Sequence, residues 1–346
     1  MKRLALIAAI GAFRLAACSQ APDKIIFHEV SNPLTLAEWN VVSLDRGHLV
    51  TSGGSVAYDV SAPLFTDYAH KFRTVYTPDA APILADGSLD FPVGTVISKT
   101  FYYPENADGV VRSEDSGGDA INLATHRVIE TRLLVRRDSG WDPVSYVWNE
   151  GETEARLKRT GAVVPLTLSG MPFAYVVPNE NQCAGCHASD MSTKALHPLG
   201  AIAPQFRDRS KMVVEGVMRP DAFTAQADYR DDELSLDVRA RSYLATNCAH
   251  CHNPVGPADT SGLDLSLSAQ SDLVLGRCKP PIAAGSGTGG HTFSIVPGDP
   301  DGSILSYRMA STDPGAMMPE LGRSIAHDEG VALIREWIAA MDGDCS

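Results

Sequence analysis

The sequence has no excess of basic residues. It contains 29 Lys and Arg against 42 Asp and Glu, which gives a formal net charge of -13 at pH 7. Nucleic-acid binding depends on Lys and Arg side chains that neutralise phosphates. We therefore expect no nucleic acid as a partner, and an acidic surface suits a protein that docks on basic patches of other proteins.

Long apolar runs and low-complexity tracts are also missing. The run from Leu4 to Phe13 is too short to span a bilayer, and no later stretch is apolar enough. The segment "GSGTGGH" lacks a following Gly-Lys-Ser/Thr and is no phosphate cradle. What remains is a globular composition, 44% hydrophobic and 21% charged over 346 residues, long enough for about two domains.

The first residues, "MKRLALIAAIGAFRLAAC", read as an export signal with a charged start and a short apolar run. The "LAAC" ending resembles a bacterial lipoprotein signal, in which cleavage before Cys18 leaves that cysteine for lipid attachment. We expect an exported protein on the periplasmic side of the cell envelope, attached to the membrane by a lipid anchor. Simple secretion, with cleavage nearby, is the alternative.

Cysteine is scarce, and four of the seven cysteines fall in two copies of Cys-x-x-Cys-His, "CAGCH" and "CAHCH". This is the attachment pattern for c-type haem. On a turn of helix, residues i and i+3 share a face, so both thiols reach one porphyrin edge, and the following histidine can reach the iron. The pattern predicts two covalent haem c groups, held by Cys183, Cys186, Cys248 and Cys251, with His187 and His252 as axial ligands.

Two other chemistries use paired cysteines: a four-thiolate zinc site and a redox dithiol. A zinc site would leave the two following histidines without a role, so we favour haem. His250 lies between the cysteines of the second motif and is interpreted as a loop histidine without a ligand role.

Once the haem and lipid cysteines are set aside, Cys278 and Cys345 remain. In an exported chain they predict a disulfide that ties "GRCKPP" to the C-terminal "GDC". Two free buried thiols are the alternative.

The second motif is framed by two predicted helices. One covers about Asp237 to Ala245, with Val238, Tyr243 and Leu244 inward. The other is "HDEGVALIREWIAAMDGD", with apolar residues at helical spacing. Residues 237–341 thereby resemble class I cytochromes c, and "MASTDPGAMMPELG" is similar to their Met-Pro distal loop. The resemblance implies Met318 as the second ligand of this haem iron. Met317 and, more remotely, His291 are alternatives.

The first motif lies in a shorter segment, "FAYVVPNENQCAGCH", in which Pro178 interrupts and nothing helical is predicted ahead of the motif. Its sixth iron ligand is left open between Met218 and His197, with Met212 as a further candidate. Met191 follows His187 too closely to reach the opposite porphyrin face. An iron with an open position is the remaining alternative.

Residues 25–177 change character. Segments such as "VISKTFYYP", "VIETRLLVRR", "VSYVWNE" and "AVVPLTL" are short and rich in β-branched and aromatic residues, which predicts a β-rich domain. We find no catalytic constellation here. Asp67, Tyr68 and His70 are interpreted as a polar loop, and neither His48 nor His126 has a companion at metal-ligand spacing.

Taken together, "YDVSAPLFTDYAHKFR", "NQCAGCHA", "NCAHCHNP" and "MMPELGRS" resemble a family of exported dihaem c-type cytochromes of undetermined physiological role. The prediction is an α+β multidomain protein: an export signal (1–18), a β-rich domain (25–177), a first haem-binding segment (178–235) and a class I cytochrome c-like domain (236–346), the last two mainly α-helical. The expected function is electron transfer between redox partner proteins, without catalytic residues. The alternative is a peroxidase-like dihaem oxidoreductase with one open iron.

Overall fold

The structure is a computed structural model that describes residues 24–113, 118–220, 223–282 and 284–345. Cys18 and the rest of the predicted export signal lie outside the described residues. Among the described residues no helix is long and apolar enough to cross a membrane.

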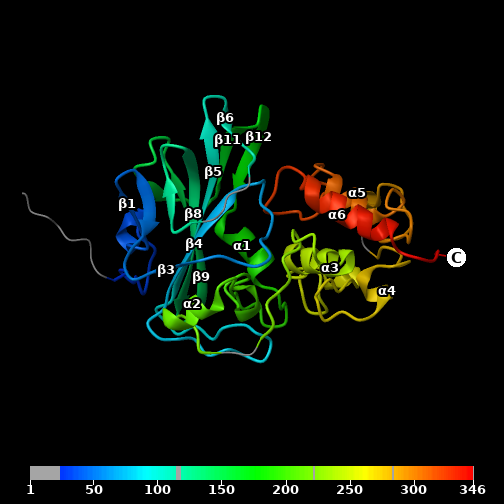
Figure 1. Cartoon of the computed structure of the whole chain (residues 1–346), viewed down its shortest axis with the longest axis horizontal. Helices are drawn as coiled ribbons and strands as arrows, with labels where there is room; N and C mark the ends of the chain where they lie inside the picture. The colour runs from blue at the N-terminus through cyan, green and yellow to red at the C-terminus, as the bar shows by residue number, and fades with distance from the viewer. Residues whose placement is uncertain (1–23, 114–117, 221–222, 283, 346) are drawn as a thin grey trace, which may run out of the picture.

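A nine-stranded sheet forms the frame of the described chain (Figure 1). Its central strands β5 and β8 contain many β-branched and aromatic residues, which favour strands, and most of their residues are buried. The order β10-β9-β8-β5-β6-β11-β12 is extended by β4, which pairs with β5, and by β3, which pairs with β4. The strands are β3 (Val56–Tyr58), β4 (His70–Tyr76), β5 (Val96–Asn106), β6 (Gly109–Val110), β8 (His126–Arg137), β9 (Gly140–Trp148), β10 (Ala155–Leu157), β11 (Ala162–Leu168) and β12 (Met171–Val177).

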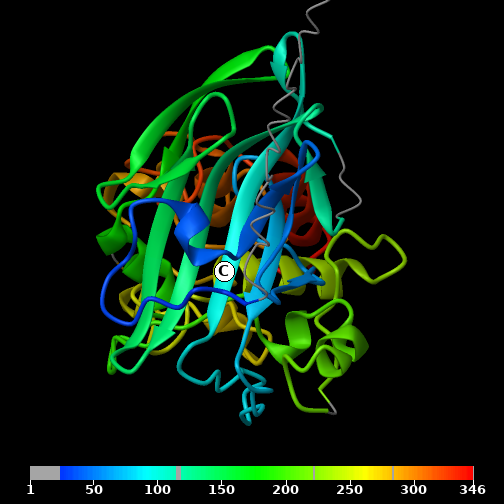
Figure 2. The same ribbon diagram turned by 90° about the vertical axis from the view of Figure 1, so that its left-hand side faces the viewer.

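The N-terminal segment covers one face of this sheet, in front of the strands in Figure 2. It contains the 3-10 helix η1 (Leu36–Trp39) and a small sheet of β1 (Val42–Asp45), β2 (His48–Thr51) and β7 (Ala120–Asn122). The indole of Trp39 is fully buried and donates a 2.7 Å hydrogen bond to the hydroxyl of Tyr146 in β9. Phe72, Leu133 and Val135 complete this apolar core.

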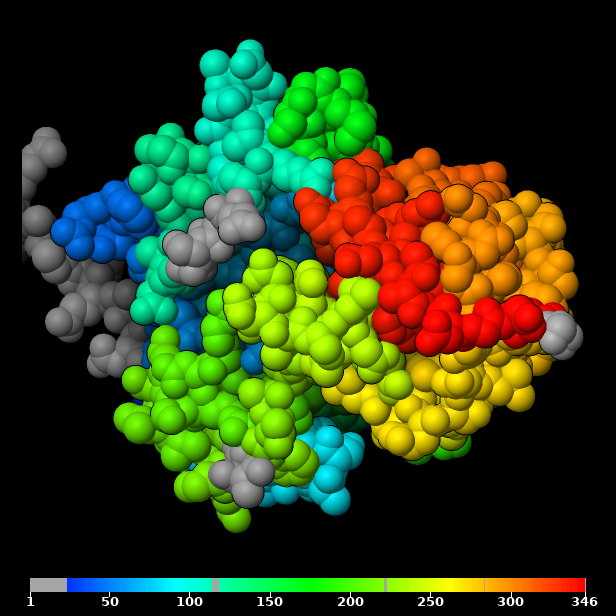
Figure 3. All heavy atoms as spheres, turned by 45° about the vertical axis from the view of Figure 1, so that its right-hand side comes forward, coloured from blue at the N-terminus to red at the C-terminus, as the bar shows by residue number. Residues whose placement is uncertain are grey.

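Residues 236–345 lie on the opposite face of the sheet and form the C-terminal lobe, yellow to red in Figures 1 and 3. The segment between the last strand and this lobe, green in Figure 1, carries the first two α-helices. The α-helices are short: α1 (Glu180–His187), α2 (Arg209–Val214), α3 (Leu236–Asn247), α4 (Asp272–Leu275), α5 (Ile304–Ala310) and α6 (Asp328–Ala339). The remaining 3-10 turns are η2 (Ala203–Gln205), η3 (Asp259–Ser261) and η4 (Gly285–Thr288).

The predicted fold class is wrong. The structure is mostly β, with 27% strand and 20% helix, its sheet curls into a half-barrel, and no helical cytochrome region is evident. Between α3 and α5 the chain runs mainly through loops, because segments such as "GSGTGG" and "VPGDPDG" combine glycines and prolines that disfavour helix. The expected mainly α-helical dihaem region is therefore replaced by loops with a few short helices.

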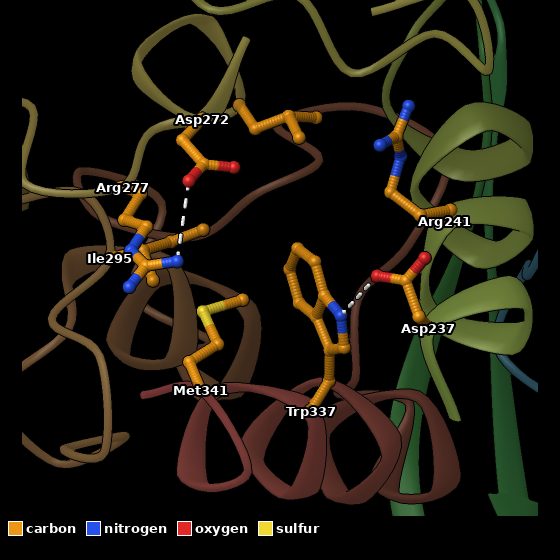
Figure 4. A pocket seen from close by; sticks show the side chains of 8 residues that line it. Asp237, Arg241, Asp272, Arg277, Ile295, Trp337 and Met341 are labelled. Atoms are coloured by element: carbon orange, nitrogen blue, oxygen red, sulfur yellow. Dashed lines mark hydrogen bonds and ion pairs between the residues drawn. The ribbon is translucent and has the colours of Figure 1, made fainter. Parts of the chain in front are cut away.

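Helices α3 and α6 pack directly on one another. Gly330 permits this, since a Cβ there would lie 2.2 Å from the hydroxyl of Tyr243. Trp337 of α6 also donates a 2.9 Å hydrogen bond to Asp237 of α3, beside a cavity of about 280 Å³ (Figure 4). Tyr243 and Leu244 are buried as expected. The inward prediction for Val238 is wrong, because this residue is 42% exposed and lies off the buried stripe.

The segment "FTDYAHK" joins the sheet to the C-terminal lobe. The carboxylate of Asp67 accepts hydrogen bonds from the backbone N–H groups of Ser324 and Ile325, at 2.7 and 3.0 Å. The ring of Phe65 stacks on His327, with 4.2 Å between centroids. The predicted polar loop is thus a contact between the two parts of the molecule.

Candidate functional site

The first Cys-x-x-Cys-His motif lies in α1. Asn179 caps this helix, since its side chain accepts a hydrogen bond from the backbone N–H of Gln182 at 2.9 Å. The side-chain oxygen of Gln182 in turn accepts from the backbone N–H of Asn179. A capped helix begins directly after Pro178, which interrupts the chain before it. The helix places Cys183, Cys186 and His187 at positions i, i+3 and i+4, on one face.

The imidazole of His187 is oriented by the backbone. Its Nδ1 lies 2.8 Å from the carbonyl oxygen of His197. Because a carbonyl only accepts, Nδ1 carries the proton and the Nε2 lone pair remains available to a metal. Burial lowers the pKa of His187 to about 4, so the ring is neutral at pH 7, which is the form that binds iron.

The second motif follows directly after α3. Cys248 ends the helix, and the chain turns so that the backbone N–H of His252 donates to the Cys248 carbonyl at 2.9 Å. The Nδ1 of His252 lies 3.0 Å from the hydroxyl of Ser261, which itself donates to Ala258 at 2.7 Å. The hydroxyl proton is used there, so Nδ1 donates and Nε2 is again available. Burial also lowers the pKa of His252 to about 4.

The two motifs, 65 residues apart in the sequence, touch each other. Cys251 lies 3.3 Å from the carbonyl oxygen of Gly185. The neighbouring Cys251 thiol lowers the pKa of Cys186, and Cys186 in turn raises the pKa of Cys251. The nearby His250 also lowers the pKa of Cys186.

The segments that follow the motifs continue this contact. The backbone N–H of Met191 donates to the Val255 carbonyl at 2.7 Å, and the Asn253 amide donates to the Ser189 carbonyl at 3.2 Å. A cavity of about 460 Å³ lies beside them, with His197 and Trp141 among its lining residues. The two attachment motifs therefore belong to one site.

Met318 lies in a loop near both motifs. Its backbone N–H donates to the carbonyl of Arg308 at 3.0 Å, and the charge of Arg308 contributes to the low pKa of His252. In the same loop, Leu321 approaches the first motif, since a Cβ on Gly185 would lie 3.0 Å from its Cδ1. Met317, the alternative, is partly buried like Met318, so burial does not distinguish the two methionines.

Arg323 holds this loop in place and was not identified from the sequence. Its guanidinium is 6% exposed and donates to the carbonyls of Met318, Ser311 and Arg308, at 2.9, 2.8 and 3.2 Å. A fourth hydrogen bond, from Nη1 at 3.2 Å, reaches the Ile325 carbonyl. A single buried side chain thus fixes the backbone on which Met318 depends.

The candidates for the sixth iron ligand at the first motif are placed less favourably than Met318 is at the second. The carbonyl oxygen of His197 accepts the hydrogen bond from Nδ1 of His187. The ring nitrogens of His197 lie 2.6 Å from the Ser189 hydroxyl and 3.3 Å from the Ala195 carbonyl oxygen. His197 therefore lies on the His187 side of the site. Met212 and Met218 are both 1% exposed and pack in an apolar cluster with residues such as Phe206. Met191 is 41% exposed.

The other singled-out histidines take part in local contacts: His48 with the Arg46 carbonyl, His126 with the Asn122 carbonyl and His291 with the Tyr307 ring. Within the described ranges, no group of three His, Cys, Asp or Glu side chains is arranged to hold a bare metal ion. Cys278 and Cys345 form a disulfide with 5.1 Å between their Cα atoms, while the four motif cysteines are unpaired.

The donor set fits covalent haem: two pairs of unpaired thiols, each followed by an oriented neutral imidazole. No protein-family model, curated protein or solved structure matches the chain. The functional argument therefore depends on the residues of the site itself.

Proposed function

We propose that this chain is an exported dihaem c-type cytochrome that transfers electrons in the bacterial cell envelope. The observation that carries the proposal is the pair of touching Cys-x-x-Cys-His motifs, in each of which Nδ1 of the histidine is engaged and Nε2 is available. The same orientation would suit a histidine that binds zinc, but the Cys-x-x-Cys-His spacing is the attachment pattern of haem c.

Haem c, when bound, supplies a one-electron iron couple. Cys183 and Cys186 would attach the first group and Cys248 and Cys251 the second, while His187 and His252 would bind the two irons. Met318 would supply the sixth ligand of the second iron. A thioether ligand raises the reduction potential, which suits an electron carrier.

Contact between the motifs supports electron exchange within the molecule. Cys251 Sγ lies 3.3 Å from the carbonyl oxygen of Gly185, the residue next to Cys186, so the second thiols of the two motifs lie close together. Two groups attached at these positions would be held close together, so an electron received by one could pass to the other without a diffusing carrier. The acidic chain, with a net charge of -13, would dock on basic surfaces of redox partner proteins.

We further propose the periplasmic side of the envelope as the location, with lipid on Cys18 as the membrane anchor. The sequence of the export signal supports this part of the proposal.

A second function is favoured by one specific observation. His197 lies on the His187 side, and Met218 packs in a hydrophobic cluster. If neither reaches the first iron, that iron has an open position and the protein is a dihaem oxidoreductase of the peroxidase type, with the second haem as its electron source.

The experiment is an absorption and paramagnetic-resonance study of the mature protein, oxidised and reduced, before and after addition of carbon monoxide or peroxide. Mass spectrometry of the same sample counts the covalent haems. Two covalent haems, both low-spin and inert to the additions, are expected for the electron carrier. A high-spin haem that binds carbon monoxide would instead support the oxidoreductase.

Two variants within one motif provide the matched control. His252→Ala should convert one haem to a high-spin form, because it removes an iron ligand, whereas His250→Ala should leave both haems low-spin. A chain that matures without any covalent haem, or equal spectra for the two variants, would contradict the proposal.

A further inference from the structure

Three cationic side chains gather on the sheet face that points toward α1. Lys71 on β4, Lys99 on β5 and Arg132 on β8 surround the ring of Phe101, at 5.8, 5.4 and 4.3 Å from its centroid. Strand register explains the cluster, because Lys71 pairs with Phe101 and Lys99 pairs with Arg132. Cross-strand neighbours project on the same face of a sheet. We call these three residues the cationic wall.

The cationic wall carries more positive than negative charge. Glu130 pairs with Arg132, at 2.5 and 2.9 Å, and also accepts from the Tyr175 hydroxyl at 2.7 Å. Among the described residues no carboxylate forms an ion pair with Lys71 or Lys99. Asp67 is close enough to act on Lys71, but one of its oxygens already accepts two backbone N–H groups.

Both ammonium groups are in a costly environment. Burial lowers the pKa of Lys99 to about 7 and holds the pKa of Lys71 well below its usual range, and neighbouring cations lower both further. Both side chains are partly buried, and charges that are withdrawn from water are normally paired in proteins. An anion placed between these groups would remove the cost.

The wall lies against the first haem motif. Lys99 and Arg132 contribute to the low pKa of His187. The charge of Arg132 acts on Cys183, and Lys99 interacts with Cys186. In Figure 1, α1 lies beside the sheet, between its strands and the C-terminal lobe.

We propose that Lys71, Lys99 and Arg132 form a carboxylate-binding site that takes the propionates of the first haem. This inference rests on the proposed function. A haem tethered to α1 would present its carboxylates at a high effective concentration, which a free acid in solution cannot match. The two lysines without carboxylate partners provide one positive charge for each of the two propionates.

The test measures both midpoint potentials by spectroelectrochemical titration of the double variant Lys71→Gln/Lys99→Gln. Removing two positive charges near one iron disfavours its reduced form, so one potential should fall while the other stays unchanged. Lys99→Arg, which keeps the charge, should behave like the wild type. Lys158→Gln, on the exposed turn after β10, is the matched control and should change neither potential.

The outcomes separate this inference from the proposed function. A wild-type protein without covalent haem by mass contradicts the proposed function. If two haems are attached and the double variant keeps both potentials, the propionate site is wrong. It is also wrong if acetate shifts a wild-type potential in a saturable way that the double variant abolishes, because the wall would then be vacant and bind a free carboxylate.

Discussion

The sheet and the C-terminal lobe are held together by different means. In β5 and β8, 11 and 12 residues long, nearly every backbone group pairs with a neighbouring strand. In the lobe, loops depend on arginines that donate to backbone carbonyls: the buried Arg323 donates to carbonyls of four residues, and the partly buried Arg241 donates to those of Ser266, Leu267 and Ala269. A few side chains can thus fix irregular chain in place, and the second Cys-x-x-Cys-His motif lies in such chain.

The comparison predicts that single changes harm the lobe more than the sheet. The largest effect is expected from Cys278→Ser/Cys345→Ser, which removes a cross-link between residues 67 positions apart. Chain-entropy arguments give a loss of about 4 kcal/mol. Urea unfolding should show the lobe, followed by haem absorbance, unfolding at lower urea than in the wild type. The sheet, followed by far-ultraviolet circular dichroism, should keep its midpoint.

Equal shifts of both signals would contradict this separation and show that the two parts unfold as one unit. A reduced wild-type sample is the control, because it opens the same cross-link without a substitution.

A smaller effect is expected from Arg323→Met. The change removes the side-chain donor of the Met318 and Ser311 carbonyls, whereas the Arg308 carbonyl keeps the Met318 N–H. Unsatisfied buried groups cost about 1–3 kcal/mol each. Partial rearrangement makes a total loss of about 3 kcal/mol reasonable. Because the loop carries Met318, the paramagnetic-resonance signal of the second haem should broaden or change.

The control for Arg323 is Arg335→Met, which removes an exposed ion pair with Asp301 and should cost less than about 1 kcal/mol. Arg323→Lys keeps the charge but not the planar fork and should restore little of the loss. An unchanged second haem signal in Arg323→Met would show that this residue does not position Met318.

The same comparison explains what could be predicted from the sequence. The four segments expected as strands lie in β5, β8, β9 and β11, and both predicted helices exist as α3 and α6, since local periodicity carries that information. The prediction that the lobe is a helical domain was wrong, because it extended the helical character of these two segments to the glycine- and proline-rich loops between them. Asp67 and Arg323 were missed because their partners are backbone groups that leave no pattern in the sequence.

The smallest effect concerns helix packing within the lobe. Gly330→Ala should cost about 2 kcal/mol, because the new methyl group would meet the buried Tyr243 hydroxyl at 2.2 Å and one helix must shift. Gly151→Ala, in a sheet turn with no atom within 4 Å of the added Cβ, is the matched control and should be nearly neutral. Urea midpoints of the haem absorbance measure both. Equal midpoints would mean that α3 and α6 adjust freely, and that the lobe gains its order from its loops alone.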